Sequence, residues 1–234
     1  MGIEKRCAQL KAIYEIYETF TACMNLACRK HCAACCTCNV VMTTLEGWMI
    51  YEHLLSISDN GDAALNSLVQ TPPARRFQPA VTINRMVEMC ALGEQPPDEQ
   101  NDPSAGRCRL TDNDICSIYT ARPFGCRAMT STEDCSLSGE AHMPNLILSA
   151  NNVVMQFIEA LDRPGASGNM TDVLLFFSDA NHRQKYLNRR HMQWPSCLKP
   201  NQGFSVLMIP PEHRTTIQPL VRDLKAVLGP SALP

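Results

Sequence analysis

Residues 28–38 read CRKHCAACCTC and place five cysteines within eleven positions. Thiolates three residues apart, such as those of Cys32 and Cys35, can converge on one metal from a single turn of chain. The neighbouring pair Cys35 and Cys36 is different, because adjacent side chains diverge by about 100° on a helix and face opposite sides of a strand. The pair therefore indicates either two metal centres, or one metal ligand beside one packed thiol.

A second block of cysteines occupies residues 108–135, where its four cysteines are eight, ten and nine positions apart. This spacing is too wide for one local metal knuckle, so we expect the two blocks to fold together around a shared site. Four thiolates on one zinc ion or one iron–sulfur cube leave a net negative charge. Arg122 and Arg127 lie beside Cys126 and are predicted to offset that charge as cofactor-binding residues. The predicted metal ligands are Cys28, Cys32, Cys35, Cys36, Cys108, Cys116, Cys126 and Cys135.

The composition restricts the class of protein. The chain has 234 residues, of which 45% are hydrophobic, and a formal net charge of −2. A chain of this length buries a core without crosslinks, and its near-neutral charge argues against a nucleic-acid partner. Residues 1–6 read MGIEKR, without the apolar run of a secretory signal, and no stretch is apolar enough to span a membrane. We therefore expect a cytoplasmic protein, in which thirteen cysteines indicate metal binding or redox chemistry rather than disulfides.

Most of the remaining sequence has helical character. Apolar residues recur every three or four positions over residues 3–20, which predicts an amphipathic helix. Thr43 and Glu46 have the spacing of a capping box and predict the start of a second helix. A polar, proline-rich loop is predicted over residues 91–107. Further helices are predicted over residues 146–161, 171–188 and 218–228, and a short candidate strand over residues 204–209.

These elements predict a mainly α fold, with a cysteine-rich metal-binding core of irregular loops and a helical C-terminal half. We place the cysteine-cluster domain and its N-terminal helix at residues 1–140, and the helical C-terminal region packed on it at residues 141–234. Free cysteine packs like a small hydrophobic residue. Packing or accessory roles are assigned to the five other cysteines, Cys7, Cys23, Cys38, Cys90 and Cys197.

Residues 116–127 read CSIYTARPFGCR and carry a family resemblance. Together with the cysteines of residues 28–36 and the helix start at Thr43 and Glu46, this run resembles the YkgJ-type CxxCxxCC cysteine-cluster family, whose pattern is C-x-I-Y-x-x-R-P-x-x-C-R. The resemblance covers about residues 28–135 and implies a zinc- or iron-chelating protein, often described as containing an iron–sulfur cluster. Some proteins of this wider group are similar to flagellin lysine methylases. That activity is not expected here, because no glycine-rich loop follows a strand to cradle S-adenosylmethionine.

The sequence thus predicts an iron–sulfur protein with one or two 4Fe–4S clusters, used for electron transfer or to support a reaction, since eight candidate ligands suffice for two cubes. One alternative is a structural zinc module that presents the C-terminal half to a protein partner. Another is a protein that stores or delivers a metal ion. All-sulfur ligation suits zinc and iron–sulfur clusters alike. No side-chain pattern marks a catalytic residue, so enzymatic activity, the redox or protein partner and the oligomeric state stay open.

Overall fold

The computed structural model describes residues 2–57, 65, 75–99, 106–188 and 192–229. Helices dominate this part of the chain and the strands are short, which confirms the mainly α class. The α-helices are α1 (Ile3–Thr21), α2 (Thr44–Ile57), α4 (Ile83–Ala91), α5 (Phe124–Arg127), α6 (Cys135–Ser138), α7 (Asn145–Leu161), α8 (Met170–Ser178), α9 (Ala180–Leu187) and α10 (Arg214–Leu228). The strands are β1 (Val41–Thr43), β2 (Thr111–Asp112), β3 (Ile115–Cys116), β4 (Ala166–Asn169) and β5 (Lys199–Pro200).

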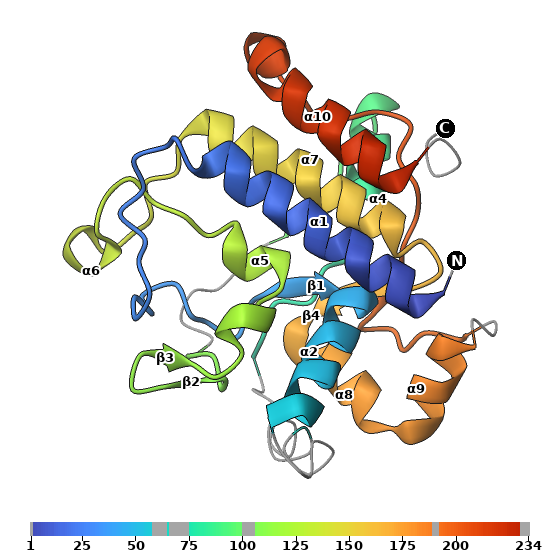
Figure 1. The fold of residues 1–234 in the computed structure, drawn as a ribbon. Coiled ribbons are helices and arrows are strands. Elements are labelled where there is room, and N and C mark those ends of the chain that lie inside the picture. Colours follow the sequence, from blue (N-terminus) through green and yellow to red (C-terminus); the bar gives the residue numbers. More distant parts are fainter. Residues whose placement is uncertain (1, 58–64, 66–74, 100–105, 189–191, 230–234) are drawn as a thin grey trace.

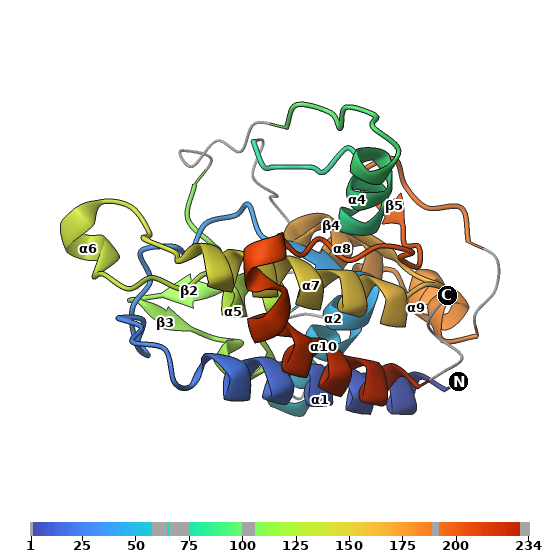
Figure 2. The same ribbon diagram turned by 90° about the horizontal axis from the view of Figure 1, so that it is seen from above.

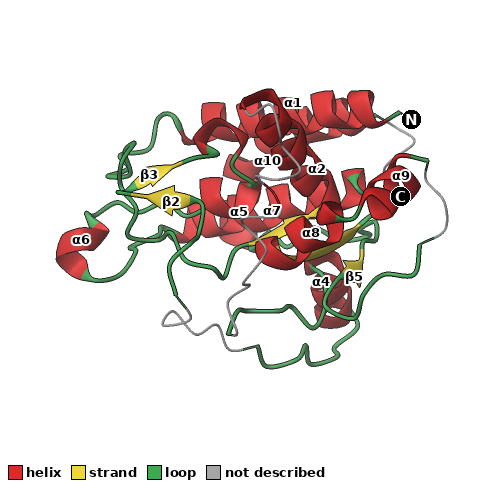
Figure 3. Ribbon diagram, turned by 90° about the horizontal axis from the view of Figure 1, so that it is seen from below, coloured by secondary structure: helices red, strands yellow, loops and turns green. Residues whose placement is uncertain are grey.

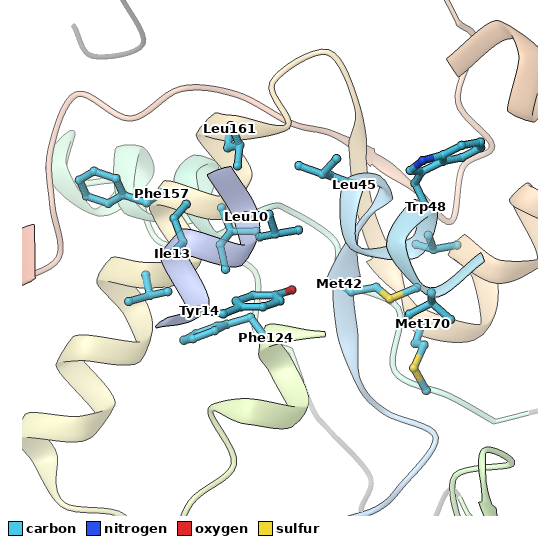
Figure 4. Packing of buried hydrophobic residues seen from close by; sticks show 14 of the residues in the cluster. Leu10, Ile13, Tyr14, Met42, Leu45, Trp48, Phe124, Phe157, Leu161 and Met170 are labelled. Carbon is cyan, nitrogen blue, oxygen red and sulfur yellow. The ribbon is translucent and has the colours of Figure 1, made fainter. Parts of the chain in front are cut away.

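The predicted first helix is confirmed as α1, which packs beside α7 and α10 (Figure 1). Its apolar stripe is buried, and Figure 4 shows Leu10, Ile13 and Tyr14 near Phe124 and Phe157 in the core. The predicted boundary between residues 140 and 141 lies in the segment between α6 and α7. Because α1 comes before this boundary while α7 and α10 come after it, the two predicted regions share one hydrophobic core.

Two antiparallel sheets complete the fold. The first has the strand order β1-β4-β5, with Val41 opposite Asn169 and Thr43 opposite Ser167. Helices α2 and α8 follow directly on β1 and β4 and pack against each other. The second sheet is the small hairpin of β2 and β3. Neither was predicted, because strands of two to four residues are too short to show an alternating pattern.

The buried carboxylate of Asp162 connects several helices through hydrogen bonds. Asp162 caps the C-terminal end of α7, and its side chain accepts hydrogen bonds from Arg6 Nη1 (2.8 Å), the Thr44 hydroxyl (2.6 Å), the Leu45 amide (2.8 Å) and the Tyr186 hydroxyl (2.8 Å). Arg6 and Asp162 form an ion pair with almost no exposed side-chain surface. These contacts join α1, α2, α7 and α9 at one point.

The predicted single helix over residues 171–188 is wrong. Helices α8 and α9 meet at Asp179, whose extended backbone (φ −84°, ψ 121°) ends α8. The Asp179 side chain then accepts a hydrogen bond from the Asn181 amide (2.7 Å) and caps α9. The helix predicted over residues 218–228 is confirmed in type, but α10 begins four residues earlier, at Arg214.

The candidate strand over residues 204–209 is wrong as well. This segment pairs with no strand among the described residues. It lies along α7, where the side-chain amide of Gln156 donates to the Val206 carbonyl (2.9 Å) and accepts from the Met208 amide (2.9 Å). Backbone groups that a neighbouring strand would satisfy are therefore satisfied by one side chain.

The proline-rich loop predicted over residues 91–107 begins where α4 ends, at Ala91. Residues 92–99 and 106–107 have no helix or named strand, and residues 100–105 lie outside the described residues. Within the described ranges, no helix combines the length and the apolar character that crossing a membrane requires.

Candidate functional site

The two cysteine blocks meet at one end of the molecule, where loops surround the hairpin of β2 and β3 and the short α6 (Figures 2 and 3). They enclose a cavity of about 260 Å³, which we call the cysteine cavity. Seven of the eight predicted metal ligands line it, and so do both predicted cofactor-binding arginines, Arg122 and Arg127. The lining cysteines are Cys28, Cys32, Cys35, Cys36, Cys108, Cys116 and Cys126. The eighth predicted ligand, Cys135, begins α6 and is not part of the lining.

The first block runs antiparallel to the start of the second. The Cys108 amide donates to the Cys36 carbonyl (2.9 Å), and the Cys38 amide donates to the Gly106 carbonyl (3.0 Å). Thr37 and Arg107 form an isolated β-bridge between these two bonds. The pairing brings Cys36 and Cys108 to neighbouring positions, although they are 72 positions apart in the sequence.

The β2–β3 hairpin places Cys116 beside this pair. Asn113 and Asp114 form its two-residue turn with positive φ angles of 46° and 62°, as expected for the type I′ turn that matches the twist of paired strands. Cys116 lies opposite Thr111, whose amide donates to the Cys108 carbonyl (3.2 Å). The hairpin thus connects Cys116, on β3, to Cys108 through Thr111 on β2.

Cys126 lies on α5, and two contacts fix that helix. The Phe124 amide donates to Glu46 Oε1 (2.6 Å), so the capping residue of α2 also holds the start of α5. Gly125 packs so closely on β1 that a Cβ would lie 2.7 Å from the Val41 carbonyl oxygen. The glycine in the R-P-F-G-C run is therefore required by a close approach of two backbones. The sequence alone did not indicate this role.

Arg122 and Arg127 make different contacts. The Arg122 guanidinium stacks 3.8 Å from the centre of the Tyr119 ring at the cavity wall. Arg127 donates to the carbonyls of Arg122 (2.9 Å) and Thr120 (2.9 Å) and pairs with Glu18 (2.6 Å) on α1. Its donors thus hold the loop that carries Arg122, which makes Arg127 a positioning residue for the cavity wall.

The surroundings of the thiols in the cavity shift their pKa values in different directions. The pKa of Cys36 is lowered to about 6, mainly by a hydrogen bond from Cys35, with smaller contributions from the charges of Arg107 and Arg122. The same hydrogen bond and burial raise the pKa of Cys35. Burial is also the main cause that raises the pKa values of the remaining perturbed thiols in the cavity, namely Cys28, Cys108, Cys116 and Cys126. Burial thus favours the neutral form of most of these thiols.

Two hydroxyl groups in the cavity wall are buried without a hydrogen bond of normal geometry among the described residues, those of Thr111 and Thr130. Thr111 lies near the thiols of Cys36 and Cys108, and Thr130 lies near the Tyr17 hydroxyl. Thr111 lies near enough to Cys36 to favour its thiolate, but not at hydrogen-bonding geometry. Hydroxyl donors and an arginine around a group of thiols fit an anionic, sulfur-rich occupant such as an iron–sulfur cluster with its four thiolates.

The sulfurs line the cavity without converging on one point. Across the residues that the structure describes, no three His, Cys, Asp or Glu side chains are grouped closely enough to hold a metal ion. The assignment of the eight cysteines as metal ligands thus stays a prediction. Comparison of the chain with protein-family models, with curated proteins and with solved structures finds no match.

Proposed function

We propose that this chain is an iron–sulfur protein that holds its cluster or clusters through the thiols of the two cysteine blocks. One observation carries the proposal: seven of the eight cysteines chosen from sequence spacing line a single cavity of about 260 Å³. The blocks, residues 28–38 and 108–135, are separated by 69 residues that include β1, α2 and α4, so chance proximity of so many thiols is a poor explanation.

The size of the cavity favours a cluster over a zinc ion. A structural zinc site keeps four sulfurs about 2.3 Å from the ion, so the closed site requires no cavity. A cube of irons and sulfides is a larger body, and each of its corners takes a thiolate from a different direction. Thiols distributed over the walls of a cavity suit the second arrangement.

The protein's own residues have definite tasks in this proposal. A bound cluster supplies one-electron redox chemistry. Arg122 offsets the negative charge of the thiolates, and Thr111 and Thr130 donate to sulfur. Cys108 is buried, so the protein shields part of the site from water. The solvent exclusion and the hydrogen bonds to sulfur together tune the potential of the cluster.

Anaerobic purification followed by iron and acid-labile sulfide analysis tests the proposal. We expect a brown protein with equal amounts of iron and sulfide, and the Cys126→Ser variant should contain less of both. Cys90→Ser is the matched control, because Cys90 is exposed on α4 and does not line the cavity. A protein with stoichiometric zinc and no sulfide would instead establish the structural zinc module. Metal that exchanges freely while the fold persists would identify a storage or delivery protein.

A further inference from the structure

Residues 131–142 form a surface loop that carries α6 and Cys135, and we call it the α6 loop. Its two ends meet at a narrow neck. The Thr132 amide donates to the His142 carbonyl (3.0 Å), and the His142 amide donates to the Ser131 hydroxyl oxygen (3.0 Å). A surface loop of this length whose ends lie so close together is an Ω-loop, a class that is frequently functional.

The neck of the loop is anchored to the first cysteine block. Ser131 is fully buried, its carbonyl accepts a hydrogen bond from the Ala27 amide (2.8 Å), and its amide donates to the Cys28 sulfur (3.2 Å). Cys28 lines the cysteine cavity. The α6 loop therefore begins in direct contact with a thiol of the cavity, and this end of the loop is fixed.

The loop beyond its neck is held by few contacts. Over the described residues, a single ion pair joins residues 133–141 to the chain outside the loop, from Arg29 to Asp134 at 3.5 Å. An exposed ion pair of this kind contributes little to stability. Figures 1 and 2 show α6 at the far end of the loop, away from α1 and α7. The loop can therefore move about its neck without breaking many interactions.

The α6 loop borders open space on the way to the cavity. A second hollow of about 580 Å³ lies next to the cysteine cavity. Cys32 and Cys36 line it from the first block, and Asp134 and Ser136, the two neighbours of Cys135, line it from the loop. A movement of the loop into this hollow carries Cys135 towards the cysteines of the first block.

Cys135 is the one predicted ligand outside the cavity lining, yet it lies within reach of the cavity. It follows Ser131 by four residues, and four residues of extended chain span about 13 Å. Because the Ser131 amide already contacts the Cys28 sulfur, a rearrangement of residues 132–135 suffices to bring the Cys135 thiol to the cavity. The neck can stay in place during this movement.

Exposed apolar side chains favour such a closure. Leu137 on α6 is 88% exposed. Ile115 and Met129 line the cysteine cavity and are exposed as well. A closure that places Leu137 against these two side chains removes apolar surface from water.

We propose that the α6 loop is a flap that closes over the cysteine cavity when metal binds and supplies Cys135 as the last ligand. The inference rests on the proposed iron–sulfur function and adds a closing step to it. In this step the Cys135 thiol releases its proton to water, and the thiolate binds an iron in place of a solvent molecule. The loop position described above is then the open one, which accounts for the place of Cys135 outside the lining.

Hydrogen–deuterium exchange of the metal-free protein and of protein loaded anaerobically with iron and sulfide tests the flap. We expect residues 131–142 to exchange at least about tenfold more slowly after loading. Cleavage by a glutamate-specific protease after the exposed Glu133 and Glu140 should slow in parallel. Cleavage after Glu212, which is exposed in the turn before α10, serves as the internal control and should not change.

Two leucine variants test the apolar contact. Leu137→Ser should bind iron but lose much of the loop's protection from exchange. Leu92→Ser is the matched control, because Leu92 is 66% exposed at the end of α4 and does not line the cavity, and it should keep the wild-type protection. Equal protection in the two variants would contradict the closing contact.

Cys135→Ser tests the ligand itself. This variant should keep iron on the other thiols while its loop stays in fast exchange after loading. Loss of all iron from Cys135→Ser would contradict a ligand that arrives last. A loop that exchanges equally fast in loaded and metal-free wild-type protein would overturn the flap and leave the proposed function standing. A wild-type chain that takes up no iron and sulfide would instead refute the proposed function.

Discussion

The buried carboxylate of Glu46 should contribute strongly to the stability of the fold, because it accepts four hydrogen bonds. One oxygen of its buried carboxylate accepts hydrogen bonds from the Thr43 amide (2.7 Å) and hydroxyl (3.0 Å). The other accepts from the Phe124 amide (2.6 Å) and the Tyr14 hydroxyl (2.8 Å). In Glu46→Gln, one of these oxygens becomes an NH₂ group, which cannot accept from an N–H donor. A buried backbone amide then loses its partner.

The magnitude follows from these contacts. A hydrogen bond to a charged group contributes about 1.5–3 kcal/mol, and the substitution removes two such bonds, so we expect a loss of about 3 kcal/mol. For a chain of this size that corresponds to a fall in the unfolding midpoint of about 6–12 °C. The loss should affect the second cysteine block in particular, because Glu46 joins the start of α2 to the start of α5, which carries Cys126.

Urea unfolding of reduced, metal-free protein measures this effect without a contribution from a bound group. Glu52→Gln is the matched control, since Glu52 is exposed on the same helix, and its effect should stay within about 0.5 kcal/mol. A Glu46→Gln variant that loses less than about 1 kcal/mol of unfolding free energy would refute the assignment of this carboxylate as the connection between α2 and α5.

Three further predictions concern particular side chains. Gly125→Ala should cost about 2 kcal/mol in urea unfolding, because the new Cβ would lie 2.7 Å from the Val41 carbonyl oxygen, whereas Gly203→Ala meets open space and should have little effect. Arg6→Met should lower the free energy of unfolding by about 3–5 kcal/mol, because it leaves the Asp162 carboxylate unpaired in the core, and Lys5→Met at an exposed position is the control. Adding Asp162→Asn should restore part of this loss, and no recovery would argue against the ion pair as its cause. In reduced, metal-free protein, the rate of alkylation of Cys36 should rise as pH increases through about 6, where its thiolate forms. Mass spectrometry should find Cys36 modified well before Cys126, and equal rates for the two cysteines would contradict the lowered pKa of Cys36.

Local sequence signals predicted the features that depend on near neighbours. The capping box is the clearest, because Thr43 and Glu46 are three residues apart and exchange the expected hydrogen bonds. The helix over residues 3–20 also needs only its own periodicity. The break at Asp179 was missed because its capping hydrogen bond interrupts a region with otherwise helical composition.

The sequence predicted which cysteines gather at the site but not how they are arranged in space. Cysteine spacing selected seven residues that line one cavity, since clustering of thiols in a sequence is visible without coordinates. Gly125 packs on β1 and Arg127 pairs with Glu18 on α1. Both elements are distant in the sequence, so these two roles could not be predicted from it. The buried hydroxyls of Thr111 and Thr130 likewise become recognisable only when the two blocks are folded together.

The packing of α1 against α7 and α10 has a consequence for how the protein is made. A nascent chain emerges from the ribosome with its N-terminus first, so α1 leaves long before the helices that cover it exist. The first cysteine block follows α1 and lacks its backbone partners at Gly106 and Cys108 until the second block has been synthesised. The cysteine cavity can therefore form only after more than half of the chain has been made, and a product truncated before residue 108 would lack one wall of it.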